Sequence, residues 1–404
     1  RIDDRVAGFF VPVILIVSLL TFFIWVFFGG IGVVSHGLFA ALSVLVVACP
    51  CVIGLATPVA LAAGLNKAAR NHILIRDTSA LEQMRNVDVV VFDKTGTLTE
   101  GHPTVIGWLW AQGQEDHYKD VLLAAESTSD HPLAEAIVTA LEGEEQVIPA
   151  HLDGFESIAG KGVRVAYQGA EYWVGSHKLL KDYQANLSDI LADMLTQYES
   201  DGNSIVYFGR ENDLLAVIAI KDQLRVTSME AIRELRTQDI EICMLTGDGE
   251  RTASSVAGSL GIMRFVADAM PDDKEDFIHK LQLQGKTVAM VGDGVNDAQA
   301  LSCADVSIAM GKGTDTLMDT AMITLRTSDL LLLPKVFRLS HQTVGLMYRN
   351  LFWAFIYNTV GIFVAAGVLY PVYDILLSPA LAGAAMALSC VSVALSSLRL
   401  SSRF

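Results

Sequence analysis

Uncharged hydrophobic runs are concentrated at the two ends of the chain. Two lie near the N-terminus, at about 9–28 and 37–64, and two lie near the C-terminus, at about 351–369 and 375–395. About 20 apolar residues in a helix match the hydrocarbon thickness of a bilayer. We therefore predict about four transmembrane helices, in two pairs that flank a long polar middle segment.

Basic residues gather beside the predicted spans on one side only: Lys67, Arg70, Arg76, Lys335, Arg338, Arg349, Arg399 and Arg403. The two outer turns between paired spans carry no Lys or Arg. Because Lys and Arg favour the cytoplasmic flanks of membrane helices, we expect both termini and the middle segment on the cytoplasmic side. The first run is too long for a cleavable signal peptide and has no small-residue cleavage site.

The middle segment, about 71–338, alternates strand-like and helix-like patterns. Hydrophobic strands are predicted at 87–92, 214–220, 240–245 and 287–291, and helices at 228–236, 251–260 and 273–283. This alternation is typical of a parallel, doubly wound α/β sheet. Residues 103–212 differ, with short strands at 162–167, 171–174 and 204–208 and helices at 120–126 and 133–141. We interpret this stretch as a second, α+β domain inserted into the first.

Composition narrows the function classes. The net charge of −16 argues against a nucleic-acid partner. The five cysteines among 404 residues are too few and too irregularly spaced for a disulfide framework. Cys49 and Cys51 lie inside a hydrophobic run, where metal binding competes with simple packing.

A candidate phosphate site follows the first buried strand, in the heptapeptide Asp93-Lys94-Thr95-Gly96-Thr97-Leu98-Thr99. The Asp93 carboxylate can attack phosphorus and hold an aspartyl-phosphate. Gly96 lets the backbone approach, and Thr95 and Thr97 can donate to phosphoryl oxygens. An ordinary strand-to-helix turn is the alternative, and the motifs that follow argue against it.

Two further polar motifs also follow predicted strands. Gly292-Asp293-Gly294-Val295-Asn296-Asp297 offers carboxylate and amide oxygens, which suit Mg²⁺ together with a phosphate. Thr246-Gly247-Asp248 offers hydroxyl and N–H donors to a transferred phosphoryl group. Lys274 can offset developing negative charge, although a Lys at a helix start is usually only a solvated surface residue.

The heptapeptide resembles the phosphorylation motif of the P-type ATPases, and the resemblance extends over the whole chain. It implies catalytic roles for Asp93, Lys94, Thr95, Thr246, Gly247, Asp248 and Lys274, with Mg²⁺ at Asp93, Thr95, Asp293 and Asp297. In the wider haloacid-dehalogenase-like superfamily an acid/base Asp usually stands two residues after the nucleophile. Thr95 occupies that place here, so an aspartyl-phosphate should persist, which suits a pump better than a phosphatase.

Ser129-Asp130-His131-Pro132 resembles the His-Pro nucleotide-binding motif of the heavy-metal subclass. The resemblance implies that Glu126, His131, Gly160 and Gly162 bind ATP, with the adenine lying on the glycine backbone. A lone His before Pro is otherwise an ordinary helix start.

Cys49-Pro50-Cys51 lies in mid-span, where Pro50 frees a backbone carbonyl and two thiolates suit a soft cation such as Cu(I). Cys-Pro-Cys resembles the ion-site signature of the heavy-metal pumps, and Tyr357, Asn358 and Met386 match the copper-type members. Zinc-type relatives place a Lys and an Asp in the last two spans, and neither charge is present here. Cys390 replaces the Ser of the copper pattern. It is either an additional soft ligand or a small packing residue, and both alternatives stay open.

We therefore predict a haloacid-dehalogenase-like doubly wound phosphorylation domain (71–102 and 213–338) with an inserted nucleotide-binding domain (103–212) and paired membrane helices in 1–70 and 339–404. The expected function is ATP-driven export of Cu(I), or of Ag(I), with Mg²⁺ as cofactor. The alternatives are a membrane-anchored phosphatase, a Zn(II) pump and a passive metal-binding membrane protein.

The resemblance also sets the expected surroundings of the chain. We expect a bacterial inner membrane and, as partners, the lipid bilayer and a copper chaperone. The 404 residues begin without Met and do not contain the family's actuator and N-terminal metal-binding domains, so the expected partners include that N-terminal part. Asp4 matches an acidic residue on the family's cytoplasmic metal path, although an exposed Asp would look the same.

Overall fold

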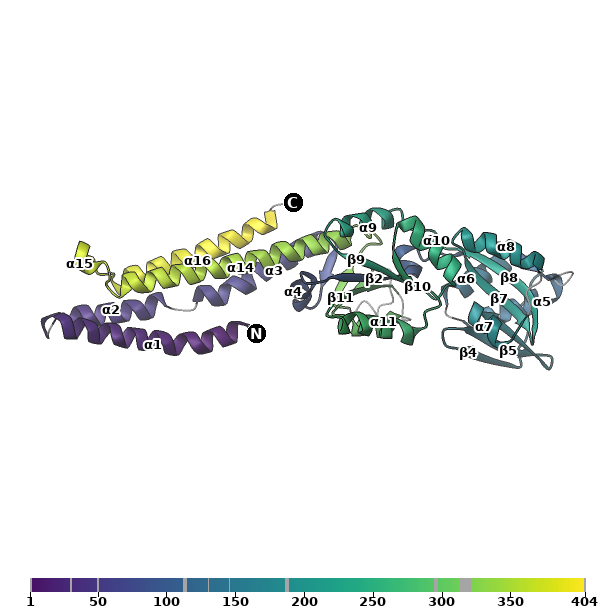
Figure 1. Ribbon diagram of the computed structural model, residues 1–404, viewed down its shortest axis with the longest axis horizontal. Helices are drawn as coiled ribbons and strands as arrows, with labels where there is room; N and C mark the ends of the chain where they lie inside the picture. The colour runs from purple at the N-terminus through teal and green to yellow at the C-terminus, as the bar shows by residue number, and fades with distance from the viewer. Residues whose placement is uncertain are drawn as a thin grey trace. The chain divides into compact units, whose positions relative to one another are not determined.

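The computed structural model describes residues 2–29, 31–48, 51–111, 115–129, 131–144, 146–185, 189–293, 297–311 and 321–402. The chain divides into two units, one formed by residues 1–71 with 337–404 and the other by residues 72–336. The first unit is helical and the second contains two β-sheets with their helices (Figure 1).

The helical unit contains α1 (Ile2–Gly29), the short turn η1 (Ile31–Val33), α2 (Val34–Val47), α3 (Cys51–Arg70), α14 (Leu332–Ala365, in this unit from Phe337), α15 (Tyr370–Tyr373) and α16 (Pro379–Ser402). Within the described residues, Pro12–Gly29 and Pro379–Leu398 are long and apolar enough to cross a membrane. Large apolar side chains of α1, such as Leu19 and Phe23, are more than half exposed, as expected of a surface that faces lipid.

About four spans were predicted, whereas among the described residues two helices meet that criterion. The second predicted run is divided, since α2 ends at Val47 and α3 begins at Cys51. Pro50 lies outside the described residues, but a proline here cannot donate its part of the helical hydrogen-bond ladder. Most of the third run lies in the C-terminal part of the long α14, where Tyr357 and Asn358 reduce the apolar character and Arg349 lies just before the run.

The first sheet of the second unit has seven strands in the order β1-β13-β12-β11-β2-β9-β10. They are β1 (Ile73–Ile75), β2 (Val89–Asp93), β9 (Glu241–Leu245), β10 (Arg264–Val266), β11 (Val288–Gly292), β12 (Val306–Met310) and β13 (Ile323–Leu325). All neighbouring pairs are parallel except β1 with β13. The predicted doubly wound sheet is confirmed.

Helices cover both faces of this sheet: α4 (Ser79–Met84), α9 (Ser228–Arg236), α10 (Glu250–Leu260), α11 (Pro271–Leu283) and α12 (Ala298–Cys303). Ile278 of α11 and Leu301 of α12 pack with Val89, Val91 and Met290 on one face. Helices α9 and α10 lie on the other side of the sheet from α11 (Figure 1). Because both faces are covered, β2 and β11 are buried along their whole length.

The second sheet has six antiparallel strands in the order β3-β8-β7-β6-β5-β4. They are β3 (Thr104–Trp110), β4 (Gly154–Ile158), β5 (Gly162–Tyr167), β6 (Ala170–Gly175), β7 (Ser204–Arg210) and β8 (Asp213–Lys221). Its helices are α5 (Glu115–Glu126), α6 (Pro132–Glu142), α7 (His177–Asp182) and α8 (Asp189–Ser200). Phe208 packs with α5 and α6 in one core, and Trp173 packs with α7 and α8 in another.

Residues 214–220 form a strand as predicted, but the prediction that this strand belongs to the parallel sheet was wrong. It is β8, which pairs with β3 and β7 in the antiparallel sheet and not with the strands of the phosphorylation centre. The seven residues from Leu214 to Ile220 are all buried, because helices cover both faces of this second sheet. A continuous apolar run is also the pattern of a parallel core strand, so the pattern cannot distinguish the two sheets.

Candidate active site

Asp93 ends β2 at the carboxyl edge of the seven-stranded sheet. Strand β2 lies between β9 and β11, and both are parallel to it. Thr246 follows β9 directly, and Asp293 follows β11 directly. Parallel strands end at the same edge of a sheet, so the three predicted motifs meet there.

Lys274 joins two carboxylates of this centre. Its Nζ donates to Asp93 Oδ1 at 2.6 Å and to Asp297 Oδ1 at 2.7 Å, and all three residues are buried. Burial alone would lower the pKa of Lys274, but the charges of Asp93 and Asp297 raise it, so the side chain stays an ammonium ion. The other oxygen of Asp93 has no hydrogen-bond partner among the described residues.

The carboxylates of Asp93, Asp293 and Asp297 have oxygen atoms within 4.8 Å of one another. Burial and the neighbouring Asp93 charge raise the pKa of Asp293 to about 7 and raise that of Asp297. A cluster that resists ionisation in this way gains from a bound cation, and carboxylate oxygens are the ligands that Mg²⁺ prefers. The donor set therefore fits Mg²⁺. Asn296 of the same motif lies outside the described residues.

A second ion pair lies beside Asp93. Lys94 Nζ contacts Asp248 Oδ2 at 2.5 Å and donates to Ser204 Oγ at 2.9 Å. Thr246 Oγ1 donates to the same Asp248 oxygen at 2.9 Å. Although burial opposes ionisation, the Lys94 charge lowers the pKa of Asp248. Lys94 is thus neutralised by Asp248 and tied to strand β7 of the second sheet.

The turn η2 (Lys94–Leu98) after Asp93 approaches Asp293 closely. Gly96 has φ +68°, and a Cβ there would lie 1.3 Å from Asp293 Oδ2. Thr97 is fully buried, and its Oγ1 has no hydrogen-bond partner among the described residues. A buried hydroxyl without a partner is unusual and fits a donor reserved for a ligand oxygen. The structure places Thr95 half-buried in the same turn, and its predicted role stays a prediction.

Three residues that the sequence analysis missed hold this turn. Arg225 Nε donates to Thr97 O at 2.9 Å, and its Nη2 donates to Gly96 O. Asp222 accepts from Thr99 Oγ1 at 2.5 Å and from Gly101 N at 3.1 Å, and Ser228 Oγ donates to Leu98 O at 2.7 Å. Asp222 directly follows β8, a strand-end signal that the sequence analysis did not use, whereas Arg225 and Ser228 lie further along the chain.

We expect Gly96→Ala to abolish Mg²⁺ binding and phosphorylation, because the new methyl group would occupy the position of the Asp293 carboxylate. Gly285→Ala is the matched control. Gly285 has φ +80°, and a Cβ there meets nothing within 4 Å. The control should lose only about 1–2 kcal/mol of folding stability, the cost of a left-handed backbone conformation for a residue with a Cβ. Equal losses of stability in urea unfolding for the two variants would contradict the close approach.

The predicted nucleotide residues lie in the second sheet and its helices. Glu126 ends α5 and is buried, and His131 is the N-cap of α6, with its Nδ1 accepting from Leu133 N at 3.2 Å. Gly160 faces the start of α11, since a Cβ there would lie 2.9 Å from Met270 Cε. Gly162 has a packing reason of its own, because a Cβ would lie 2.1 Å from Val174 O on the neighbouring strand β6.

Burial raises the pKa of Glu126 from 4.5 to about 7. The folded protein therefore holds this proton more tightly than the unfolded chain, and stability is lost as the pH rises from about 4.5 through 7. At about 1.4 kcal/mol per pKa unit, the loss amounts to roughly 3 kcal/mol. We expect Glu126→Gln to remove this pH-dependent loss of stability. The difference in unfolding free energy between variant and wild type should then change by roughly 3 kcal/mol between pH 4.5 and 8. A pH-independent difference in urea unfolding would contradict the assignment.

The predicted copper residues lie in the helical unit. Met386 and Cys390 of α16 pack against Ala56 of α3 and Ala354 of α14. Asn358 is buried, and neither its Oδ1 nor its Nδ2 has a hydrogen-bond partner among the described residues, whereas Tyr357 is about half exposed (46%). Cys49 and Pro50 lie outside the described residues, and Cys51 is described only as the first residue of α3.

A known protein family and several curated bacterial proteins are similar to this chain in sequence. The haloacid dehalogenase-like hydrolase family matches residues 87–305. A copper-exporting P-type ATPase of Legionella pneumophila is 43% identical over 99% of this chain and 54% of its own length. A silver exporting P-type ATPase of Salmonella typhimurium is 44% identical over 100% of this chain and 49% of its own length.

Solved structures of heavy-metal P-type ATPases are also similar to this chain. A zinc-transporting PIB-type ATPase in the E2.Pi state has a TM-score of 0.70 at 32% identity and covers 99% of this chain and 64% of its own. The catalytic domain of the CPx-ATPase CopB-B has a TM-score of 0.56 at 28% identity, covering 67% of this chain and 97% of its own.

The chain belongs to the haloacid dehalogenase-like hydrolases. Within them it corresponds to the C-terminal portion of the heavy-metal P-type ATPases, and it spans about half the length of the curated relatives that it matches.

Proposed function

We propose that this chain is the catalytic and metal-translocating part of an ATP-driven exporter of Cu(I), or of Ag(I), that works through a phosphorylated Asp93. The observation that carries the proposal is the buried Asp93 carboxylate, held by Lys274 beside Asp293 and Asp297. The names of the copper- and silver-exporting relatives support the cargo.

In the proposed reaction an Asp93 carboxylate oxygen attacks the γ-phosphorus of ATP. The bond between that phosphorus and the β–γ bridging oxygen breaks, ADP leaves, and an acyl phosphate remains on Asp93. Lys274, which already contacts Asp93, offsets the developing charge on the transferred group. Thr97 Oγ1, which has no hydrogen-bond partner among the described residues, is proposed to donate to the oxygens of this group. Thr246 Oγ1 would do so after releasing Asp248.

Asp93, Asp293 and Asp297 would hold Mg²⁺, with Thr95 in the same turn. When bound, Mg²⁺ neutralises and orients the phosphate oxygens. The raised pKa of Asp293 means that part of the population carries a proton near neutral pH, and that proton must leave before the carboxylate can serve as a ligand.

The nucleotide is proposed to bind at Glu126, His131 and Gly160. A Cβ on Gly160 would lie 2.9 Å from Met270 Cε, at the start of the helix α11 that carries Lys274, and this proximity supports the proposal. Burial lowers the pKa of His131, and the charges of Asp248 and Lys94 act on it in opposite directions. The hydrogen bond from Lys94 Nζ to Ser204 Oγ also joins the phosphorylation turn to the second sheet, and phosphoryl transfer requires the nucleotide near Asp93.

The proposed metal path runs through the helical unit by Cys49, Cys51, Tyr357, Asn358, Met386 and Cys390. Asn358 on α14 and Ser389 on α16 have buried polar atoms without partners among the described residues. Buried amides and hydroxyls normally have partners, so these atoms fit a site that receives a ligand. Thiolate and thioether donors select a soft monovalent ion.

We expect Cys49→Ser to abolish Cu(I) binding by the full chain in detergent, because the change removes one of two thiolates. Cys390→Ser should weaken binding only if its thiol is a ligand, which settles its role. Met347→Leu, on α14, is the control and should bind as wild type. X-ray absorption that shows only oxygen and nitrogen neighbours around the bound copper would refute the thiolate site.

We further propose that the chain lies in a bacterial inner membrane with the α/β unit in the cytoplasm, and that the lipid bilayer, a copper chaperone and the N-terminal part of the same pump are its partners. The bacterial relatives and the basic residues beside the apolar helices support this orientation.

Labelling from γ-³²P-ATP tests the function. The chain is incubated with Mg²⁺-ATP and with Cu(I), Ag(I) or Zn(II) in turn, and acid-stable label is counted. The proposal predicts that Cu(I) or Ag(I) changes the steady-state label and that Zn(II) does not. A response to Zn(II) alone would replace the copper proposal by a zinc pump.

A further inference from the structure

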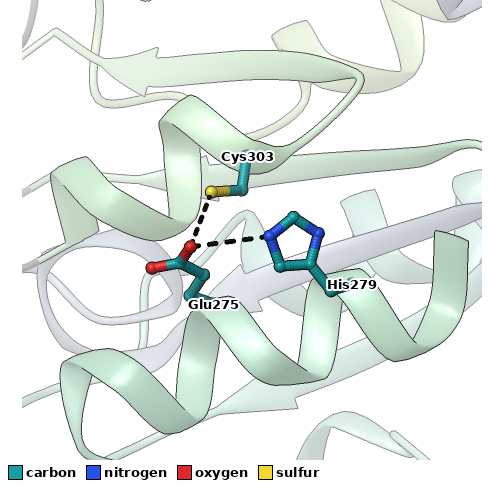
Figure 2. A group of neighbouring side chains, drawn as sticks. All are labelled: Glu275, His279 and Cys303. Carbon is teal, nitrogen blue, oxygen red and sulfur yellow. Dashed lines mark hydrogen bonds and ion pairs between the residues drawn. The ribbon is translucent and has the colours of Figure 1, made fainter.

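A second cluster of possible metal ligands lies outside the carboxylate cluster of Asp93, Asp293 and Asp297. It consists of Glu275, His279 and Cys303. Glu275 and His279 are one turn apart on α11, and Cys303 is the last residue of α12. Their ligand atoms all lie within 4.8 Å of one another. Figure 2 shows the Glu275 carboxylate between the Cys303 thiol and the His279 ring. Neither the phosphoryl chemistry nor the metal path uses these residues.

The distances suit a tetrahedral metal site. Cys303 Sγ lies 3.4 Å and His279 Nε2 lies 3.5 Å from Glu275 Oε1. Ligands at ordinary zinc distances lie roughly 3.3–3.8 Å apart on a tetrahedron. All three side chains are at least partly exposed. Small rotations can therefore bring Cys303 Sγ and His279 Nε2 to a similar distance, and a metal can enter from solvent.

Gln282 fixes the tautomer of His279. Its Nε2 donates to Cys303 O at 2.8 Å and to Asp305 Oδ2 at 3.2 Å, so its Oε1 must be the acceptor that faces His279 Nδ1 at 3.1 Å. The proton of a neutral imidazole is thereby held on Nδ1, and the lone pair of Nε2 points to Glu275. Metal-bound histidines are oriented by this kind of hydrogen bond on the second ring nitrogen.

We propose that Glu275, His279 and Cys303 bind a borderline divalent cation of the Zn(II) class. One sulfur, one nitrogen and one oxygen donor suit Zn(II), whereas Mg²⁺ and Ca²⁺ require oxygen ligands and Cu(I) disfavours carboxylate. Metal binding displaces the thiol proton that Cys303 now donates to Glu275, with no change of oxidation state. Thiolate and carboxylate together neutralise the ion.

Three protein ligands leave the fourth position to water, so the ion is exchangeable. Glu275 directly follows Lys274, and Asp297 is the N-cap of α12. The ion would therefore link α11, which carries Lys274, to α12, whose N-cap is Asp297, and these two residues form an ion pair in the active site.

Cobalt(II) spectroscopy on the full chain tests the site. The protein carries Cys49→Ser, Cys51→Ser and Cys390→Ser, which remove the thiols of the proposed copper path and leave Cys243 and Cys303. We expect one thiolate-bound Co(II) per chain, with a charge-transfer band in the near ultraviolet, four-coordinate visible bands, and displacement by Zn(II). Cys303→Ser should remove the charge-transfer band, and His279→Gln and Glu275→Gln should weaken binding.

Gln282→Ala should lower the affinity about 10- to 100-fold, although Gln282 does not contact the ion. Asp276→Asn on the same helix is the matched control and should bind as wild type. In the protein that carries only the three Cys→Ser changes (the parent protein), Zn(II) should also slow alkylation of Cys303 by iodoacetamide, as measured by peptide mass spectrometry. Absence of the cobalt bands in the parent protein, or their persistence in Cys303→Ser, would overturn the proposal.

Discussion

Replacement of Asp93 by asparagine is expected to abolish phosphorylation of the chain by ATP. The amide has nearly the shape of the carboxylate and can stay at the end of β2, but it cannot attack phosphorus. Wild-type protein should give acid-stable label that hydroxylamine releases, as expected of an acyl phosphate. The variant should give none.

Asp88→Asn is the matched control for this loss. Asp88 lies just before the same strand, where its Oδ2 accepts from Thr287 N at 2.9 Å. It is therefore at the opposite edge of the sheet from the phosphorylation site, and the control should be labelled as wild type. Label that persists in Asp93→Asn would place the phosphoryl group elsewhere and refute the proposed mechanism.

Replacement of Lys274 by methionine is expected to lower the rate of phosphorylation about 10²- to 10³-fold, the usual effect of removing one group that stabilises transition-state charge. It should also destabilise the fold by about 3–5 kcal/mol, because Asp93 and Asp297 would lose their buried cationic partner. Single-turnover labelling and urea unfolding measure the two effects.

Lys280→Met on the same helix is the control, since Lys280 is exposed. It should change neither quantity measurably. Mg²⁺ should recover part of the stability of Lys274→Met, because the ion supplies the missing positive charge. A rate close to wild type in Lys274→Met would show that Lys274 only compensates charge in the resting protein.

The catalytic edge was predictable because its residues follow buried strands. A run such as Val89–Phe92 identifies a strand by its apolar side chains alone, and a polar residue directly after it must lie at the sheet edge. The motifs at Asp93, Thr246 and Asp293 could therefore be placed together before any contact was known. The inserted antiparallel sheet was harder to delimit, because β8 is buried on both faces and resembles a parallel strand.

Other parts of the site depend on contacts that sequence spacing does not encode. Arg225 holds Gly96 and Thr97 from about 130 positions away, and nothing in its neighbourhood in the chain marks that role. Cys303 meets His279 only because α11 and α12 pack on the same face of the sheet. Pro50 was expected to free a backbone carbonyl, but the division of the second run into α2 and α3 was not predicted.

The most direct measurement is to trap the acyl phosphate and locate it. Chain incubated with Mg²⁺-ATP is acid-quenched and reduced with borohydride, which converts an aspartyl-phosphate to homoserine, and peptides are then sequenced by mass spectrometry. Our account predicts homoserine at position 93 in wild type and none in Asp93→Asn. Homoserine at another aspartate, or at no position despite bound label, would contradict it.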